Sequence, residues 1–231
     1  ICKKNMDNTR TYNTMIGASI GFVILTGLAM LCYPGGTVNN HHSVGYSFLQ
    51  NFFSDLGRYK TFLQQPKLLS LTFFFLGVLI VSTVSIRFNW ALTDDLDGEG
   101  KHPIVSVLAR FFGIAYAIAM LGIACTPYDL FLDEHIFIVR VCFSLLIPLS
   151  ICYTILIYKY QRMPNRYAIL FIITAVMLSI YLYILILGPK SNENPYLQTV
   201  AQKVIVYSLV FSLMYLAIGA KKYISKDRVF E

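Results

Sequence analysis

Six separate stretches of this chain are apolar enough and long enough to cross a lipid bilayer. A hydrocarbon core of about 30 Å requires about 20 helical residues, because each residue lengthens an α-helix by about 1.5 Å. Each stretch meets or approaches that length. The stretches lie at about residues 16–33, 68–86, 104–126, 137–158, 167–188 and 200–220. The sequence therefore predicts an all-α fold, a polytopic membrane helix bundle with six transmembrane helices.

The composition agrees with a surface that faces lipid. Hydrophobic residues make up 56% of the chain and charged residues only 13%, whereas soluble domains carry about 25% charged residues. Ionised groups are costly in lipid, so a low charge content is expected of such a bundle. The connections between the stretches are too short for a soluble domain, with residues 34–67 as a partial exception. We therefore expect residues 1–231 to form a single six-span transmembrane domain.

Basic residues are unevenly distributed between the two ends of the predicted bundle. With six spans, the N-terminus, the second and fourth loops and the C-terminus share one side, which carries twice as many Lys and Arg residues as the other. Because basic residues bias a loop toward the cytoplasm, we expect both termini to be cytoplasmic, in the inner or plasma membrane of the cell. The same residues predict contact with anionic lipid head groups. No basic stripe is interleaved with aromatics outside the spans, so nucleic acid is not an expected partner.

The first loop is the longest and the most informative. Within residues 45–56, apolar residues recur at intervals of three and four, which predicts an amphipathic helix of about three turns that Gly57 ends. We expect this short interfacial helix to lie flat on the outer membrane surface with its aromatic side chains in lipid. The alternative is a lid folded over the mouth of the bundle.

Polar side chains that could carry chemistry gather on the outer side, in residues 51–58 and 126–135. Both segments lie at the same membrane depth, so a helix bundle could bring them together. The candidate binding residues are Ser54, Asp55, Arg58, Asp129, Asp133 and His135. Carboxylates and an imidazole suit acid–base catalysis or a divalent cation.

A structural interpretation of the same residues stays open. Asp133 and Glu134 stand where the fourth helix begins, and negative charge there interacts favourably with the helix dipole. Ser54 and Asp55 can bond backbone amides within a turn. The sequence holds no C-x-x-C pair, nucleotide-binding loop, H-E-x-x-H or G-x-S-x-G motif, and we therefore predict no metal and no other cofactor.

Arg110 is the one charged residue well inside a predicted span. It lies about 9 Å from the cytoplasmic end at the rise of an α-helix. No acidic residue falls within a predicted span to pair with it. We therefore expect Arg110 to extend back to the head groups, or to bond a phosphate or backbone carbonyls, rather than to act as a buried switch.

Three further features carry expectations for packing and loops. Gly17 with Gly21, and the small residues at 109, 113 and 117, have the four-residue spacing of helix-packing faces. Residues 94–100 resemble the first half of a calcium loop, but the required Glu at position twelve is replaced by Ser106, so we expect a solvated acidic turn. Cysteines near the outer helix ends leave a disulfide open, although buried free thiols are favoured; these cysteines are Cys32, Cys125 and Cys142.

The chain resembles a widespread family of six-helix prokaryotic membrane proteins of unknown function. The resemblance rests on residues 51–57 (NFFSDLG), on residues 126–129 (TPYD) with His135 soon after, and on Gln202 and Lys203 at the start of the sixth stretch. The layout is more distantly similar to the Frag/DRAM-like membrane proteins, whose related Ser-Asp-x-Gly turn is not fully matched. The resemblance implies a six-span bundle with an outer-facing polar pocket, and it implies no reaction, substrate or cofactor.

Two functions follow from these observations. The first is a non-enzymatic bundle that binds a lipid or small molecule, or serves as an accessory subunit of a membrane assembly, with membrane lipids and other membrane protein subunits as partners. The alternative is a membrane-embedded enzyme that acts on a lipid or lipid-linked substrate at the outer leaflet through Asp55, Asp129 and His135. A transporter ranks last, because the spans offer mostly Ser, Thr and Tyr near the midplane.

Overall fold

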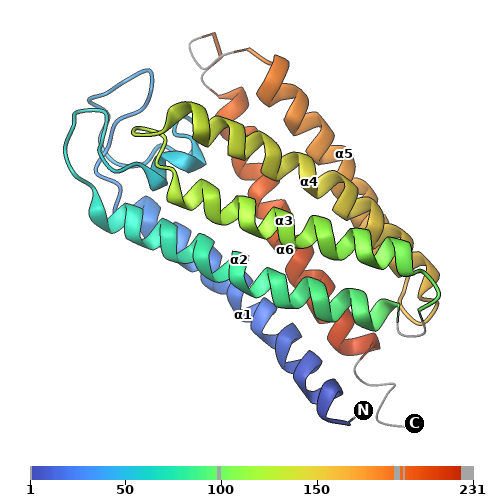
Figure 1. Ribbon diagram of the computed structural model, residues 1–231. Coiled ribbons are helices and arrows are strands. Elements are labelled where there is room, and N and C mark those ends of the chain that lie inside the picture. The colour runs from blue at the N-terminus through green and yellow to red at the C-terminus, as the bar shows by residue number, and fades with distance from the viewer. Residues whose placement is uncertain (1, 98–99, 190–192, 195, 225–231) are drawn as a thin grey trace.

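The computed structural model describes residues 2–97, 100–189, 193–194 and 196–224, and long helices dominate this part of the chain (Figure 1). One short 3₁₀-helix, η1 (Phe53–Gly57), accompanies them. The long helices are α1 (Cys2–Leu31), α2 (Leu68–Leu96), α3 (Pro103–Cys125), α4 (Leu132–Lys159), α5 (Arg166–Leu187) and α6 (Leu197–Tyr223). Each of these six is long and apolar enough to cross a membrane, which confirms the predicted all-α membrane bundle.

Several helices extend beyond the apolar stretches that predict them. Helix α1 begins at Cys2 rather than near residue 16, and α2 ends at Leu96 rather than near residue 86. Its additional residues include Asn89, Thr93 and Asp95, all of which are buried. Polar side chains of this kind remain helical because other helices satisfy them, and an apolar run alone does not reveal that support.

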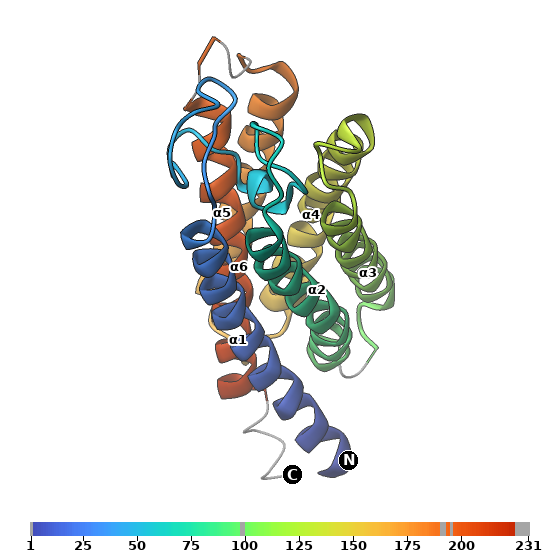
Figure 2. The same cartoon turned by 90° about the vertical axis from the view of Figure 1, so that its left-hand side faces the viewer.

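The six helices form a ring in chain order. Each packs against the helix before and after it, and α6 closes the ring against α1. Of the apolar window of α6, 56% is buried, against 22% for α5. Helix α6 therefore turns most of its surface toward the rest of the protein, and α5 presents most of its surface outward. Figures 1 and 2 place the start of α1 and the end of α6 at the same end of the bundle, opposite the connection between α1 and α2.

One of the two predicted small-residue faces packs against a neighbouring helix. Ala109, Gly113 and Ala117 are buried on α3. A Cβ atom at Gly113 would lie 2.3 Å from the side-chain amide carbon of Asn89, so α2 and α3 approach closely there. The prediction for α1 is wrong within this chain, because a Cβ at Gly17 or Gly21 would meet no atom within 4 Å. The described cysteines Cys32, Cys125, Cys142 and Cys152 are free thiols.

Candidate functional site

Residues 32–67, here called the lid, connect α1 to α2 and cover one end of the bundle (Figures 1 and 2). The three-turn amphipathic helix predicted over residues 45–57 does not form; turns occupy its first part, and η1 is the regular element. Residues on both its polar and its apolar sides, such as Asn51, Asp55 and Leu56, have 0% exposure. The second half of the segment, residues 51–57, is therefore largely enclosed by protein, whereas Phe48 and Leu49 are exposed. This burial favours the lid alternative over an interfacial helix.

An aromatic cluster anchors the lid to the helices. The Phe53 ring of η1 lies with its centroid 6.0 Å from that of Phe22 on α1. The corresponding distances to Phe74 on α2 and Tyr207 on α6 are both 5.6 Å. Gly57 ends η1 against the same cluster, since a Cβ there would lie 2.8 Å from the ring of Phe74. Burial of these rings supplies the apolar part of the lid's attachment.

Asp55 is the centre of the lid's hydrogen bonds. Its Oδ2 accepts from the Asn51 side-chain amide at 2.9 Å and from the Phe52 backbone N–H at 2.8 Å. Its Oδ1 accepts from the hydroxyl of Tyr128, in the connection between α3 and α4. A fully buried carboxylate is costly unless several donors satisfy it, and Asp55 has three. The carboxylate thus joins the lid to a distant part of the chain.

Arg58 and Asp129 strengthen the same joint. Arg58 donates from Nη1 to the Tyr128 hydroxyl at 2.6 Å and from Nε to the Lys60 carbonyl at 3.0 Å. Asp129 accepts from the backbone N–H groups of Tyr59 at 3.0 Å and Lys60 at 2.8 Å. Residues 51–60 and 128–129 are therefore adjacent, as the sequence predicts, but Tyr128 connects them. Sequence reasoning gave Tyr128 no such role, because a Tyr near a span end is typical of the membrane interface.

Two buried lysines, neither of which belongs to a catalytic motif, hold the two ends of η1. Lys203 of α6 donates from Nζ to the Asn51 carbonyl, and to the Thr199 carbonyl at 2.8 Å. Lys67 donates to the Leu56 carbonyl at 2.8 Å. Both ammonium groups are buried and bond carbonyl oxygens in the described structure. The signal for Lys203 was its position inside an apolar stretch, where an ionisable residue is a functional candidate.

Burial shifts the titration of the lid's charged groups. Burial raises the pKa of Asp55, and the hydrogen bonds from Tyr128 and Asn51 and the charge of Arg58 oppose that shift. Burial lowers the pKa of Lys67 to about 7, with Asp55 acting in the opposite direction. Burial and the charge of Asp55 raise the pKa of Tyr128. The ammonium of Lys67 therefore changes its charge close to neutral pH.

The remaining candidates, Ser54, Asp133 and His135, do not join this network. Asp133 is exposed in the first turn of α4, as the helix-dipole interpretation expects. His135 is 6% exposed, and its Nδ1 lies 2.6 Å from the Thr126 carbonyl oxygen. Ser54 and His135 instead line a cavity of about 30 Å³ beneath the lid, with Gln202 of α6 as the third polar side chain. Gln202 also accepts from the Phe53 backbone N–H at 2.8 Å.

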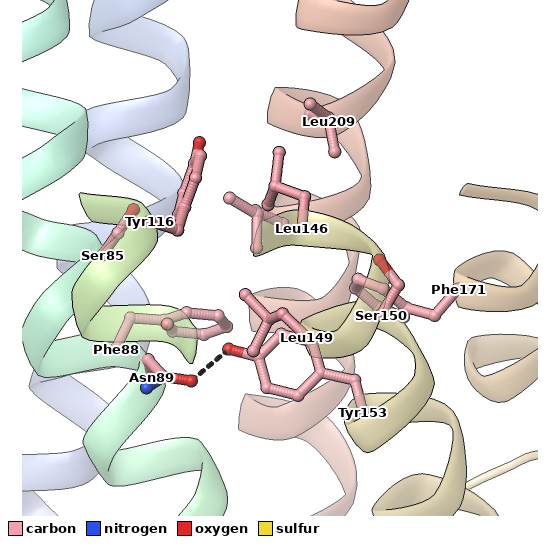
Figure 3. A pocket seen from close by; sticks show the side chains of 12 residues that line it. Ser85, Phe88, Asn89, Tyr116, Leu146, Leu149, Ser150, Tyr153, Phe171 and Leu209 are labelled. Carbon is pink, nitrogen blue, oxygen red and sulfur yellow. Dashed lines mark hydrogen bonds between the residues drawn. The ribbon is translucent and has the colours of Figure 1, made fainter. Parts of the chain in front are cut away.

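A second cavity, of about 20 Å³, lies deeper in the ring among α2, α3, α4, α5 and α6. Figure 3 shows Asn89 of α2 and Tyr153 of α4 joined at its edge, where the Tyr153 hydroxyl donates to Asn89 Oδ1 at 2.7 Å. The Asn89 amide nitrogen donates to the Arg110 carbonyl at 3.3 Å. This pair links three helices and satisfies the polar atoms that it buries.

The opposite end of the bundle contains a separate polar group. Arg110 forms an ion pair with Asp94 at 3.3 Å and donates from Nε to Thr93 Oγ1 at 3.1 Å. The expectation that no acid is available to Arg110 is wrong, because α2 continues through residue 94.

The expected solvated acidic turn over residues 94–100 is also wrong for Asp95 and Asp97. Asp95 is 3% exposed and accepts from the Tyr12 hydroxyl at 2.5 Å. Asp97 accepts from the His102 backbone N–H and from the Ser106 hydroxyl, both at 2.7 Å. These acids hold α1, α2 and α3 together; residues 98–99 of the turn lie outside the described residues.

The six apolar helices define a multi-pass membrane protein. Comparison of the chain with protein-family models, with curated proteins and with solved structures finds no match. Among the described residues, no group of three or more His, Cys, Asp or Glu side chains is placed to hold a metal ion. A functional assignment of this protein therefore rests on the contacts and cavities that its side chains form.

Proposed function

We propose that this membrane protein is a non-enzymatic binding protein whose lid encloses a site for a lipid or an apolar small molecule. One observation carries the proposal: the lid is held by buried polar groups above a cavity, and three separate elements direct polar side chains to that cavity. Ser54 comes from η1, His135 from α4 and Gln202 from α6. The rest of the lining is aliphatic and aromatic, a combination typical of sites for apolar ligands.

The same geometry supports binding over catalysis by the predicted Asp and His residues. Both oxygens of Asp55 accept hydrogen bonds from the chain, and so do both oxygens of Asp129. His135 lines the cavity, but neither carboxylate does. A general acid or base must reach its substrate within hydrogen-bond distance. The enzyme alternative therefore has one of its three residues at the cavity.

We extend the proposal to orientation and partners. The end with α1's first turn and α6's last turn carries the excess of Lys and Arg, so we place it in the cytoplasm and the lid outside the inner or plasma membrane. Membrane lipids are the proposed ligands, and other membrane subunits are proposed partners. We also propose that the chain is related to the six-helix prokaryotic family and, more distantly, to the Frag/DRAM-like proteins.

Native mass spectrometry of the protein released from lipid nanodiscs tests the binding proposal. We expect the wild type to retain a lipid or small molecule that Asp55→Asn loses, because the neutral amide cannot accept from all three of the lid's donors. Asp133→Asn is the matched control, since Asp133 is an exposed acid at the same end. Equal retention by wild type and Asp55→Asn, or no retained molecule in either, would contradict the proposal.

Labelling in intact cells tests the orientation. We expect a membrane-impermeant maleimide to react with His42→Cys in the lid, and Lys222→Cys at the end of α6 to react only after permeabilisation; both variants are made in a background without native cysteines. His42 and Lys222 are both exposed, so accessibility within the protein is matched. Labelling of position 222 from outside would reverse the proposed orientation.

A further inference from the structure

His135 has one ring nitrogen whose role the lid's own hydrogen bonds do not explain. Nδ1 lies 2.6 Å from the Thr126 carbonyl oxygen. A carbonyl oxygen only accepts hydrogen bonds, so Nδ1 carries the proton, and the neutral ring has its lone pair on Nε2. Nε2 is buried and has no hydrogen-bond partner in the described part of the chain. A buried acceptor of this kind requires a donor that the protein itself does not supply.

The cavity that His135 lines offers complementary polar groups. The Phe53 backbone N–H bonds to Oε1 of Gln202, which fixes the orientation of that amide, and the same amide also interacts with the Tyr181 hydroxyl. The hydroxyl of Ser54 can both donate and accept. The other lining residues are Phe22, Phe53, Phe74, Val78, Met120, Ile123, Val139, Phe143 and Val206. A ligand here thus meets one strong acceptor, a few neutral polar groups and an apolar wall.

These groups select among classes of ligand. An anion is disfavoured, because the lone pair of His135 repels it and none of the described residues that line the cavity is cationic. An ammonium group would lose its hydration for a single strong acceptor. A metal ion needs several ligands, and a lone imidazole with a hydroxyl and an amide does not provide a usual set. A neutral hydroxyl fits, because it donates once to Nε2 and can accept once from the hydroxyl of Ser54.

We infer that this cavity binds a neutral hydroxyl group, which donates a hydrogen bond to Nε2 of His135. The inference rests on the proposed binding function and names the class of ligand. A buried water and the terminal hydroxyl of an apolar alcohol share this chemistry. The volume of about 30 Å³ is sufficient for one water or one such head group. For an alcohol, we place the exit of the apolar chain past Met120, which lines the cavity, is partly exposed and has a flexible side chain.

Nitrogen NMR on ¹⁵N-histidine-labelled protein in phosphatidylcholine nanodiscs tests the inference. The chain has 4 His residues, and His135→Phe assigns the resonances of His135. We expect Nε2 of His135 to be unprotonated and to shift when 1-decanol is added but not when decane is added. We also expect 1-decanol to raise the Tm of the wild type by several degrees and to leave that of His135→Phe unchanged. His102→Gln, at the opposite end of the bundle, should respond like the wild type.

The possible outcomes distinguish a bound alcohol from a bound water, and they distinguish failure of the hydroxyl assignment from failure of the proposed binding function. A response to 1-decanol alone supports an apolar alcohol, whereas an Nε2 resonance that exchanges magnetisation with water and ignores 1-decanol supports a trapped water. A proton on Nε2, a resonance that responds to neither source, or equal responses to decane and 1-decanol would overturn the inference. If native mass spectrometry finds a lipid retained equally by wild type and His135→Phe, the binding function stands and the hydroxyl assignment fails. If no lipid is retained but Nε2 accepts a hydrogen bond from water, the hydroxyl assignment stands and the proposed binding function fails.

Discussion

The two ends of the bundle bury similar polar side chains and use them for different purposes. At the cytoplasmic end we propose, Asp95 bonds Tyr12 and Asp94 pairs with Arg110, so acids on one helix hold the adjacent helices. At the lid end, Asp55 bonds Asn51, Phe52 and Tyr128, all of which lie outside the long helices. The first arrangement reinforces contacts that apolar packing already makes. The second gives a definite structure to a segment that would otherwise have little regular structure of its own.

This difference shows where polar groups matter most in a membrane bundle. Helices satisfy their own backbone hydrogen bonds, so an acid between two helices adds to a stable framework. The lid has five residues of 3₁₀-helix and two isolated bridges as its regular structure among the described residues. Backbone–backbone bonds satisfy part of the lid, and four side chains bond further backbone groups of residues 51–60; these are Asp55, Lys67, Asp129 and Lys203. Loss of one of these side chains should therefore destabilise the lid as a whole.

The largest effect should come from replacing the buried acid at each end. Asp55→Leu leaves the Asn51 amide, the Phe52 N–H and the Tyr128 hydroxyl without their acceptor, and we expect a loss of about 3–5 kcal/mol in the free energy of unfolding. Asp95 accepts from the Asn8 side-chain amide at 2.8 Å as well as from Tyr12. For Asp95→Leu we expect a smaller loss of about 1–3 kcal/mol, because Asn8 is partly exposed and can bond water instead. Denaturant unfolding in detergent measures both values.

Limited proteolysis distinguishes the lid from the framework in the same pair of variants. We expect Asp55→Leu to be cleaved within residues 34–67 while its helices remain intact, and Asp95→Leu to keep the protection of the wild type there. Equal losses of stability together with equal cleavage would remove the distinction between the two ends.

Glycine substitutions should have the next largest effect and compare close packing under the lid with close packing deeper in the bundle. A Cβ at Gly57 would lie 2.8 Å from Phe74, and one at Gly113 would lie 2.3 Å from Asn89. We expect Gly57→Ala and Gly113→Ala each to lower the free energy of unfolding by about 1–3 kcal/mol through overpacking. Gly17→Ala is the control, since its Cβ meets no atom within 4 Å; it should be neutral or stabilising by up to about 1 kcal/mol. A destabilised Gly17→Ala would indicate that this face of α1 packs against a partner.

Lys67 of the lid should make the free energy of unfolding depend on pH. Burial lowers the pKa of Lys67 from 10.5 to about 7. Between these two values the unfolded chain binds one proton more than the folded chain, so the contribution of Lys67 to stability rises with pH in that window. The upper limit is about 1.4 kcal/mol for each pH unit. Thermal unfolding between pH 7 and pH 9 should show this rise in the wild type and not in Lys67→Met. Parallel profiles for the two proteins would contradict a buried Lys67 ammonium.

Much of the fold follows from the sequence because membrane insertion depends on local properties. A run of apolar residues of sufficient length predicts a spanning helix whatever its neighbours are, and all six were correctly predicted. The meeting of residues 51–58 with residues 126–135 also followed, because helix connections on one side of a bundle share a depth. For Asp55, Arg58 and Asp129 this expectation agrees with the structure.

Features that depend on tertiary partners could not be predicted in the same way. The end of α2 was placed ten residues early, since Asn89, Thr93 and Asp95 look like loop residues until other helices supply their partners. The apolar spacing within residues 45–56 is expected both for a segment buried against lipid and for one buried against protein. The pattern alone therefore does not distinguish an interfacial helix from a lid. Tyr128 and Lys203 have their roles because of groups more than 70 residues away in sequence, and no local spacing encodes such a distance.

The smallest effect is expected from breaking the ion pair between Arg110 and Asp94, which tests whether a partly exposed charge pair contributes as much as the buried Asp55 does. Both side chains are partly exposed, 26% for Arg110 and 32% for Asp94, and exposed ion pairs contribute about 0–1 kcal/mol. Arg110 also bonds Thr93 and lies with its guanidinium carbon 5.0 Å from the centre of the Trp90 ring, so it keeps contacts without Asp94. Asp94→Asn should therefore lower the free energy of unfolding by less than about 1 kcal/mol, and added salt should reduce that difference. A loss as large as that of Asp55→Leu would mean that charged groups at this end also determine the structure, and the two ends would then differ only in the segment that they hold.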